Sequence, residues 1–162
     1  MNMTENPSET RWNKWITRLA HLVFRFTRPM TLGVRGIVLD SEEQVFLVRH
    51  SYVHGWHFPG GGVETGETLE QALAKELREE GNIMLEGEPQ FHGVFLNRHV
   101  SPRDHVAVFV VRAFHQTAPK TSDAEIIEAR FFPIKSLPAT TTKGTRRRLS
   151  EVLDDAQKAQ EW

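Results

Sequence analysis

The chain has 162 residues, of which 39% are hydrophobic and 25% are charged, a composition typical of one globular domain. The absence of cysteine excludes disulfides, thiol catalysis and cysteine-ligated zinc, and it agrees with a reducing, cytoplasmic compartment. The formal net charge of −1 provides no overall positive field, so we expect no strong binding of nucleic acid.

The N-terminal region differs from the rest of the chain. Residues 1–10 are polar and without periodicity, which predicts a disordered tail. Residues 11–27 carry basic side chains and no acid, and their apolar residues recur at helical spacing. We therefore divide the chain into residues 1–28, a tail plus a basic amphipathic helix, and a domain over residues 29–162. Packing of this helix on the domain or on a partner subunit, as in a homodimer, is favoured; a membrane-surface helix and an organelle presequence stay open.

The first half of the domain alternates strand and loop patterns. Leu32–Leu39 and Gln44–Arg49 read as two strands joined by a turn, so we expect a hairpin. Residues 51–62 form a loop rich in glycine and aromatics, and Thr68–Glu80 has the period of a helix that Thr68 can cap.

The second half continues with further strands and a closing helix. Phe91–Asn97 and Asp104–Phe114 predict strands, Ala129–Phe132 a short strand, and Thr145–Lys158 a helix. Strands around one central helix, with helices at the flanks, indicate an α/β fold with a mixed sheet.

The central helix carries three acidic residues on one face. Glu76, Glu79 and Glu80 stand at positions i, i+3 and i+4. Each close pair costs roughly 0.2–0.5 kcal/mol, and the helix dipole disfavours anions at this C-terminal end. A hard divalent cation such as Mg²⁺ would offset both effects. A solvated acidic helix end explains the same spacing.

The segment around this helix resembles the Nudix box of the MutT-like Nudix hydrolases, G-x5-E-x7-R-E-U-x-E-E-x-G-U, where U is aliphatic. Residues 61–83 match it at Gly61, Glu67, Glu76, Leu77, Glu79, Glu80 and Ile83. Two positions vary: Lys75 replaces the family arginine, and Asn82 replaces the glycine that ends the helix. Asn tolerates the left-handed conformation expected there.

The resemblance implies a Nudix-type α/β/α sandwich and hydrolysis of a nucleoside diphosphate linked to another moiety, with Mg²⁺ (or Mn²⁺) as cofactor. The implied metal ligands are the Gly60 carbonyl, Glu76, Glu79, Glu80 and one late-loop acid, for which Glu125 is our choice and Glu128 its competitor.

The resemblance also assigns roles in catalysis. Glu79 is our first choice as general base. Glu67 orients the loop and the helix carboxylates. Lys75 keeps the charge of the family arginine but not its planar fork. The complete set of box glutamates favours an enzyme. The alternative is a catalytically weak Nudix-fold module that binds a nucleotide for regulation.

Substrate contacts are less well defined by the sequence. The candidate phosphate contacts lie in or beside strands: Arg35, Arg49, Arg98 and Arg112. Trp56 and Phe58 could stack on a base, and packing explains them equally well. The histidines form no convincing zinc motif. We expect a small nucleotide-type diphosphate as substrate, and the absence of a basic stripe makes processing of RNA ends the weaker hypothesis.

Overall fold

The computed structural model describes residues 29–154 and 156–162. The predictions for residues 1–28, including the basic helix and its membrane or subunit contact, therefore lie outside the described residues. Among those described, no helix is long and apolar enough to cross a membrane.

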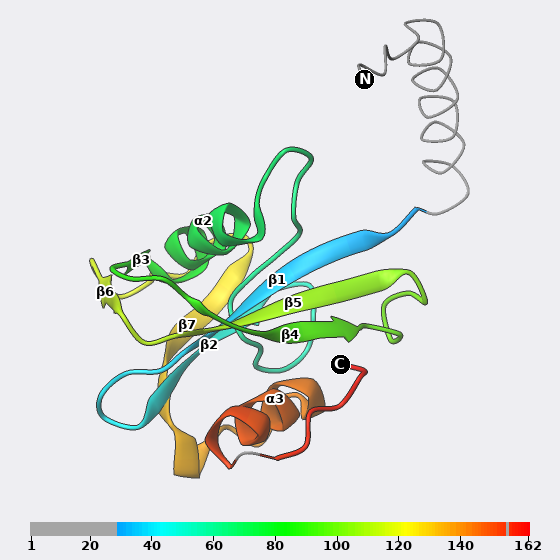
Figure 1. Ribbon diagram of the computed structural model, residues 1–162. Helices are drawn as coiled ribbons and strands as arrows, with labels where there is room; N and C mark the ends of the chain where they lie inside the picture. The colour runs from blue at the N-terminus through cyan, green and yellow to red at the C-terminus, as the bar shows by residue number, and fades with distance from the viewer. Residues whose placement is uncertain (1–28, 155) are drawn as a thin grey trace, which may run out of the picture. The chain divides into compact units, whose positions relative to one another are not determined.

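The central sheet has three strands in the order β1-β5-β4 (Figure 1). β1 (Thr31–Val38) runs parallel to β5 (Asp104–Val111), and β4 (Gln90–Leu96) pairs antiparallel with β5. The last six residues of β5 are buried, which explains their run of branched and aromatic side chains. The predicted mixed sheet is confirmed.

The predicted hairpin is wrong. β2 (Gln44–His50) pairs antiparallel with β7 (Ile126–Pro133), and only an isolated bridge between Leu39 and Val45 joins it to the chain before it. The turn instead connects two different sheets. β2 is buried almost throughout, so its apolar pattern specifies burial but not which strand lies beside it.

Two short strands were not predicted. β3 (Ile83–Leu85) follows the acidic helix and pairs with β6 (Phe114–Gln116). The expected single strand from Asp104 to Phe114 is therefore two strands. β3 begins two residues after the end of the helix that carries the acidic face, and its pairing with β6 anchors the chain there.

The closing helix is shorter than predicted. A 3-10 turn (Ile134–Ser136) leads to α3 (Lys143–Leu153), and Asp154 ends it by donating its N–H to the Ser150 carbonyl. The chain then returns to the central sheet, where Glu161 forms a bridge with Leu96. The tertiary pairing overrides the helical composition of the last residues.

Two helices lie on opposite sides of the sheets (Figure 1). One hydrophobic cluster joins Leu73 and Leu77 of α2 (Leu69–Gly81) to Val34. The other joins Leu149 of α3 to Ile37. Because alternate strand residues point to opposite faces, β1 supplies both cores. This layering is the predicted α/β/α sandwich.

The ends of α2 explain its position. The Thr68 hydroxyl accepts a hydrogen bond from the Gln71 N–H, and the Gln71 side-chain oxygen accepts one from the Thr68 N–H. The two bonds form a complete capping box. At the other end Asn82 has φ +53°, the left-handed conformation predicted for it. The helix therefore begins and ends at fixed residues, which sets the register of its acidic face.

Candidate active site

A loop of residues 59–63 runs along β1 and supplies the backbone of the site. The Val34 N–H donates to the Gly61 carbonyl at 2.8 Å, and the Val63 N–H donates to the Leu32 carbonyl at 2.8 Å. The loop thus behaves as an extra strand, and its position relative to β1 is fixed.

Two glycines of this loop are required by their surroundings. Gly60 has φ +142°, and a Cβ there would collide with the Val34 carbonyl oxygen. At Gly61 a Cβ would lie 2.5 Å from Oε1 of Glu76. The loop can therefore approach both β1 and the acidic helix only because these residues lack side chains.

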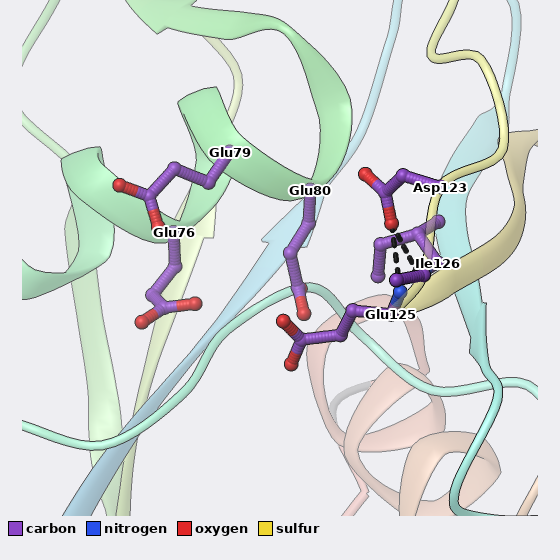
Figure 2. Close-up of a pocket in the computed structure, with 7 residues that line it drawn as sticks. Glu76, Glu79, Glu80, Asp123, Glu125 and Ile126 are labelled. Atoms are coloured by element: carbon purple, nitrogen blue, oxygen red, sulfur yellow. Dashed lines mark hydrogen bonds between the residues drawn. The ribbon is translucent and has the colours of Figure 1, made fainter.

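Five carboxylates line one pocket of about 310 Å³ (Figure 2). Glu76, Glu79 and Glu80 come from α2, and Asp123 and Glu125 come from the loop before β7. The carboxylate ends of Glu80 and Glu125 face one another in Figure 2. The predicted acidic face and the predicted late-loop acid are thus brought together.

Glu80 is the most perturbed of these acids. Burial raises its pKa from 4.5 to about 7, although the Gly60 N–H donates to its Oε2 at 2.7 Å and the Arg35 charge also opposes the shift. Burial likewise raises the pKa of Glu76, with the Glu79 charge adding to it. Both shifts come chiefly from burial, so the two carboxylates lie in a partly dry pocket.

His50 lies beside Glu80 without forming an ion pair. Its Nε2 is 3.5 Å from Oε1 of Glu80, but burial, assisted by the Arg35 charge, lowers the histidine pKa to about 4. The ring is therefore neutral near pH 7. Neither ring nitrogen has a hydrogen-bond partner within the described residues. His50 is the buried last residue of β2, one residue beyond the strand predicted from the sequence.

Glu125 is positioned by a turn and by a tyrosine. Asp123 Oδ1 accepts from the N–H groups of Glu125 and Ile126, at 2.9 and 2.7 Å. The Tyr52 hydroxyl donates to Glu125 Oε1 at 3.1 Å. Sequence reasoning missed Asp123, although an aspartate two residues before Glu125 is a typical turn signal and could have found it.

Lys75 performs the pairing expected of the family arginine. Its Nζ donates to Glu67 at 2.9 Å and to Glu64 at 3.1 Å. The bond to Glu67, followed by that to Glu64, raises the lysine pKa. A bond from the Glu64 N–H and then one from Lys75 lower the pKa of Glu67. The ammonium therefore fixes Glu67 at the entrance to α2.

Arg35 reaches the loop from β1. Its Nη1 donates to the Gly60 carbonyl and, at 3.3 Å, to the Phe58 carbonyl. The carbonyl that the resemblance implies as a metal ligand is thus occupied by a predicted phosphate contact.

Three predicted phosphate contacts lie away from the carboxylates. Arg49 pairs with Glu128 at 3.1 Å and lines a second pocket of about 390 Å³ together with Tyr52. Arg98 pairs with Glu161 at 2.9 Å, and Arg112 is exposed beyond β5. Neither Arg98 nor Arg112 lines the carboxylate pocket. Glu128, bound to Arg49, is not in that pocket either.

The two predicted stacking residues belong to the core. Phe58 is fully buried, and Trp56 is 5% exposed with its ring edge-on to Phe132 at 4.6 Å. Such rings have no free face for a base, so the structure contradicts the stacking role predicted for them and supports packing.

The carboxylates fit a hard divalent cation in chemistry. Among the described residues, however, no three acidic or histidine side chains already stand in the geometry of a metal site. Glu79 is 58% exposed on its side chain and is held only by a long, exposed ion pair with Arg78 at 3.7 Å, so it can change rotamer at little cost. A cation at this pocket would be bound by drawing these side chains inward.

Comparison with known proteins identifies the family. Residues 29–153 match the family model of the NUDIX domain, and the chain therefore belongs to the Nudix hydrolase family. The ADP-ribose pyrophosphatase of Methanocaldococcus jannaschii is 28% identical over 134 residues, which cover 79% of this chain and 77% of that protein.

Other relatives match a shorter stretch. The RNA pyrophosphohydrolase of Photobacterium profundum is 52% identical over 46 residues, or 28% of this chain. The chain therefore spans about a quarter, 26%, of that relative's length.

Solved structures support the fold. A MutT NUDIX hydrolase from Burkholderia pseudomallei has a TM-score of 0.66 at 22% identity, covering 76% of this chain and 98% of that one. An ADP-ribose pyrophosphatase from Streptococcus suis has a TM-score of 0.64 at 18% identity, covering 83% and 97%. At these identities the likeness establishes the fold alone.

Proposed function

We propose that this Nudix hydrolase is a divalent-metal-dependent pyrophosphohydrolase that cleaves the diphosphate bond of a nucleoside diphosphate linked to another moiety. The observation that carries the proposal is the pocket in which five carboxylates converge and the pKa of Glu80 rises to about 7. Such excess negative charge suits a site for divalent cations and phosphate. As part of the same proposal, residues 29–162 form the catalytic domain.

In this proposal Glu76, Glu79, Glu80 and Glu125, with the Gly60 carbonyl, hold Mg²⁺ or Mn²⁺. The bound cation supplies neutralisation of the diphosphate oxygens and orientation of the attacking water. Glu79 accepts the proton of that water, because it lines the pocket and its exposed side chain is free to turn toward it.

Other residues orient these groups and the substrate. Lys75 fixes Glu67, which supports the loop next to Glu76. Tyr52 holds the Glu125 carboxylate at the pocket. Arg35 and Arg49 contact the phosphates, the first from the carboxylate side and the second from the adjoining pocket.

The test is a panel of nucleotide diphosphates assayed with Mg²⁺ and with Mn²⁺, with products identified by mass. Nucleotide sugars, dinucleotides, ADP-ribose and 5′-triphosphorylated oligonucleotides belong in the panel, the last two because they correspond to the names of relatives. We expect a nucleoside monophosphate among the products. Glu79→Gln is the inactive control, and Glu70→Gln, an exposed acid at the start of the same helix, is the matched active control.

The second candidate is a nucleotide-binding module with weak catalysis. Its support is the variant residue Lys75 together with the absence, in the described part of the chain, of a metal ligand set that is already formed. Binding of a nucleotide without turnover of any panel member would establish this candidate and refute the first.

A further inference from the structure

Arg35 contacts the Gly60 carbonyl, although the proposed function assigns Arg35 to the substrate phosphates and the carbonyl to the metal ion. The guanidinium Nη1 donates to the carbonyls of Gly60 and Phe58, so it is held by two backbone groups of one loop. β1 and this loop are joined on both sides of the contact. The Val34 N–H donates to Gly61 and the Gly36 N–H donates to Pro59, at 2.8 and 2.9 Å. These bonds fix the two backbone segments that carry the guanidinium and the carbonyls.

The charge of Arg35 also acts on the acidic pocket. The Gly60 N–H donates to Glu80 Oε2 at 2.7 Å, and the Gly60 carbonyl accepts from Arg35, so one residue contacts both charged groups. Lys75, however, is bonded to Glu67 and Glu64 at the other end of the loop. Arg35 thus provides positive charge on the side of the pocket where the Gly60 carbonyl lies.

We propose that Arg35 is a metal-controlled switch: its guanidinium and a divalent cation compete for the Gly60 carbonyl, and cation binding transfers the guanidinium to the substrate diphosphate. The inference rests on the proposed function, because it takes this carbonyl as a metal ligand. Two cations that share one carbonyl oxygen would repel each other strongly in a partly buried site. The displaced guanidinium has five N–H donors in a planar fork, which match two phosphate oxygens.

The switch has a consequence for the order of binding. Before the cation arrives, Arg35 is engaged by the loop and contributes little to phosphate binding. Afterwards it is free to bind phosphate. Cation and diphosphate therefore favour each other's binding through Arg35, in addition to their direct attraction. The enzyme would be assembled for its substrate only when the cation is already present.

The first test observes the guanidinium directly by nitrogen NMR of arginine side chains in the whole protein. The Arg35 Nε resonance is assigned by its loss in Arg35→Lys. Saturation with Mg²⁺ should shift this resonance and speed rotation of the guanidinium, because two backbone hydrogen bonds are released. An Arg35 resonance that does not move while Mg²⁺ saturates the protein overturns the proposal.

The second test measures Mn²⁺ affinity by calorimetry in wild type, Arg35→Lys, Arg35→Gln and Arg98→Gln. Competition for the carbonyl predicts that both Arg35 variants bind Mn²⁺ about 5-fold more tightly or better, since a lysine is hydrated and mobile and holds the carbonyl weakly. Repulsion by charge alone predicts that Arg35→Lys equals wild type, which would overturn the switch. Arg98→Gln, the matched control, should bind Mn²⁺ as wild type does, because Arg98 pairs with Glu161 and does not line the carboxylate pocket.

These experiments separate the two proposals. No binding of Mn²⁺ or Mg²⁺ by wild type, together with no hydrolysis, refutes the proposed function itself. Metal binding and hydrolysis with an unmoved Arg35 resonance refute the switch alone.

Discussion

Two buried glutamates of this protein have opposite surroundings. The Glu151 side chain is 1% exposed and accepts from Arg148 at 2.6 Å and from the Ala159 N–H at 2.9 Å, with His92 at 3.0 Å. The Glu80 side chain is 8% exposed and accepts one backbone bond, while its neighbours include the acids of the pocket. Burial is nearly equal, but only the first charge is balanced.

The comparison indicates which cluster serves the fold and which serves a ligand. The Glu151 cluster joins α3, β4 and the C-terminal segment, and Arg148 also stacks on the Phe95 ring with its Cζ at 3.8 Å. The Arg148 and Glu151 charges are opposite and lie 2.6 Å apart, although Nε and Nη1 of Arg148 have no hydrogen-bond partner among the described residues. Around Glu80 the fold gathers five carboxylates at one pocket, and Arg35 is the positive charge that acts on Glu80 there. Such an arrangement costs stability, so we interpret it as retained for binding.

The strongest test of this comparison removes the balanced acid. Glu151→Gln should lower the free energy of unfolding by about 3–5 kcal/mol, because it leaves the fully buried Arg148 charge uncompensated. Urea denaturation followed by circular dichroism measures the loss. The control is Glu86→Gln, which breaks an exposed contact with His115 and should change stability by less than about 1 kcal/mol. Equal stability of both variants would contradict the structural role of the cluster.

The next test removes an acid from the pocket. Glu79→Gln should lower kcat by about 10²-fold or more and leave the fold intact, because this acid acts on the reacting water in the proposed mechanism. Steady-state rates on whichever panel substrate is turned over measure the effect, with unfolding curves run in parallel. A wild-type rate in Glu79→Gln refutes the role given to this residue, and an equal loss in Glu70→Gln would attribute the effect to the helix instead.

The acidic helix could be predicted from sequence because its signals are local. The capping box at Thr68, the spacing of the three glutamates and the left-handed residue Asn82 all lie within one stretch of chain. Family resemblance added the late-loop acid Glu125, which the fold brings to the same pocket. Features that depend on neighbours along the chain were therefore the predictable ones.

Features that depend on distant segments were missed or wrong. The hairpin failed because a strand buried on both faces carries no information on its partner. The sequence around Phe58 does not distinguish a ring that packs in the core from one that stacks on a base. Its full burial in the structure favours packing. The bond between Arg35 and the Gly60 carbonyl joins residues that no spacing rule connects.

A smaller effect concerns the dependence of stability on pH. The pKa of Glu80 is raised from 4.5 to about 7, so between these values the native state holds more protons than the unfolded chain. This group therefore makes metal-free stability fall as pH rises from about 4.5 to 7. Relative to wild type, Glu80→Gln should gain about 1–3 kcal/mol at pH 7.5 and lose that gain near pH 4.

Urea unfolding at both pH values, with EDTA present, measures this gain. Excess Mg²⁺ should remove the advantage of Glu80→Gln at pH 7.5, because a bound cation stabilises the native carboxylates of wild type alone. The same gain at pH 4 as at pH 7.5 would show that Glu80 is not protonated by burial.

The smallest expected change in activity concerns Lys75, which forms an ion pair with Glu67 next to the acidic pocket. Lys75→Arg keeps the charge and restores the fork that can hold Glu67 through two bonds, so kcat should change by less than about 3-fold. Lys75→Met removes the tie and should lower kcat by about 10-fold, while stability should fall by less than in Glu151→Gln, because the Lys75 side chain is 22% exposed and water screens its ion pairs. Steady-state rates and unfolding curves of both variants decide. A loss of stability in Lys75→Met as large as in Glu151→Gln would place Lys75 with the structural cluster, and the division between the two regions would then fail at this residue.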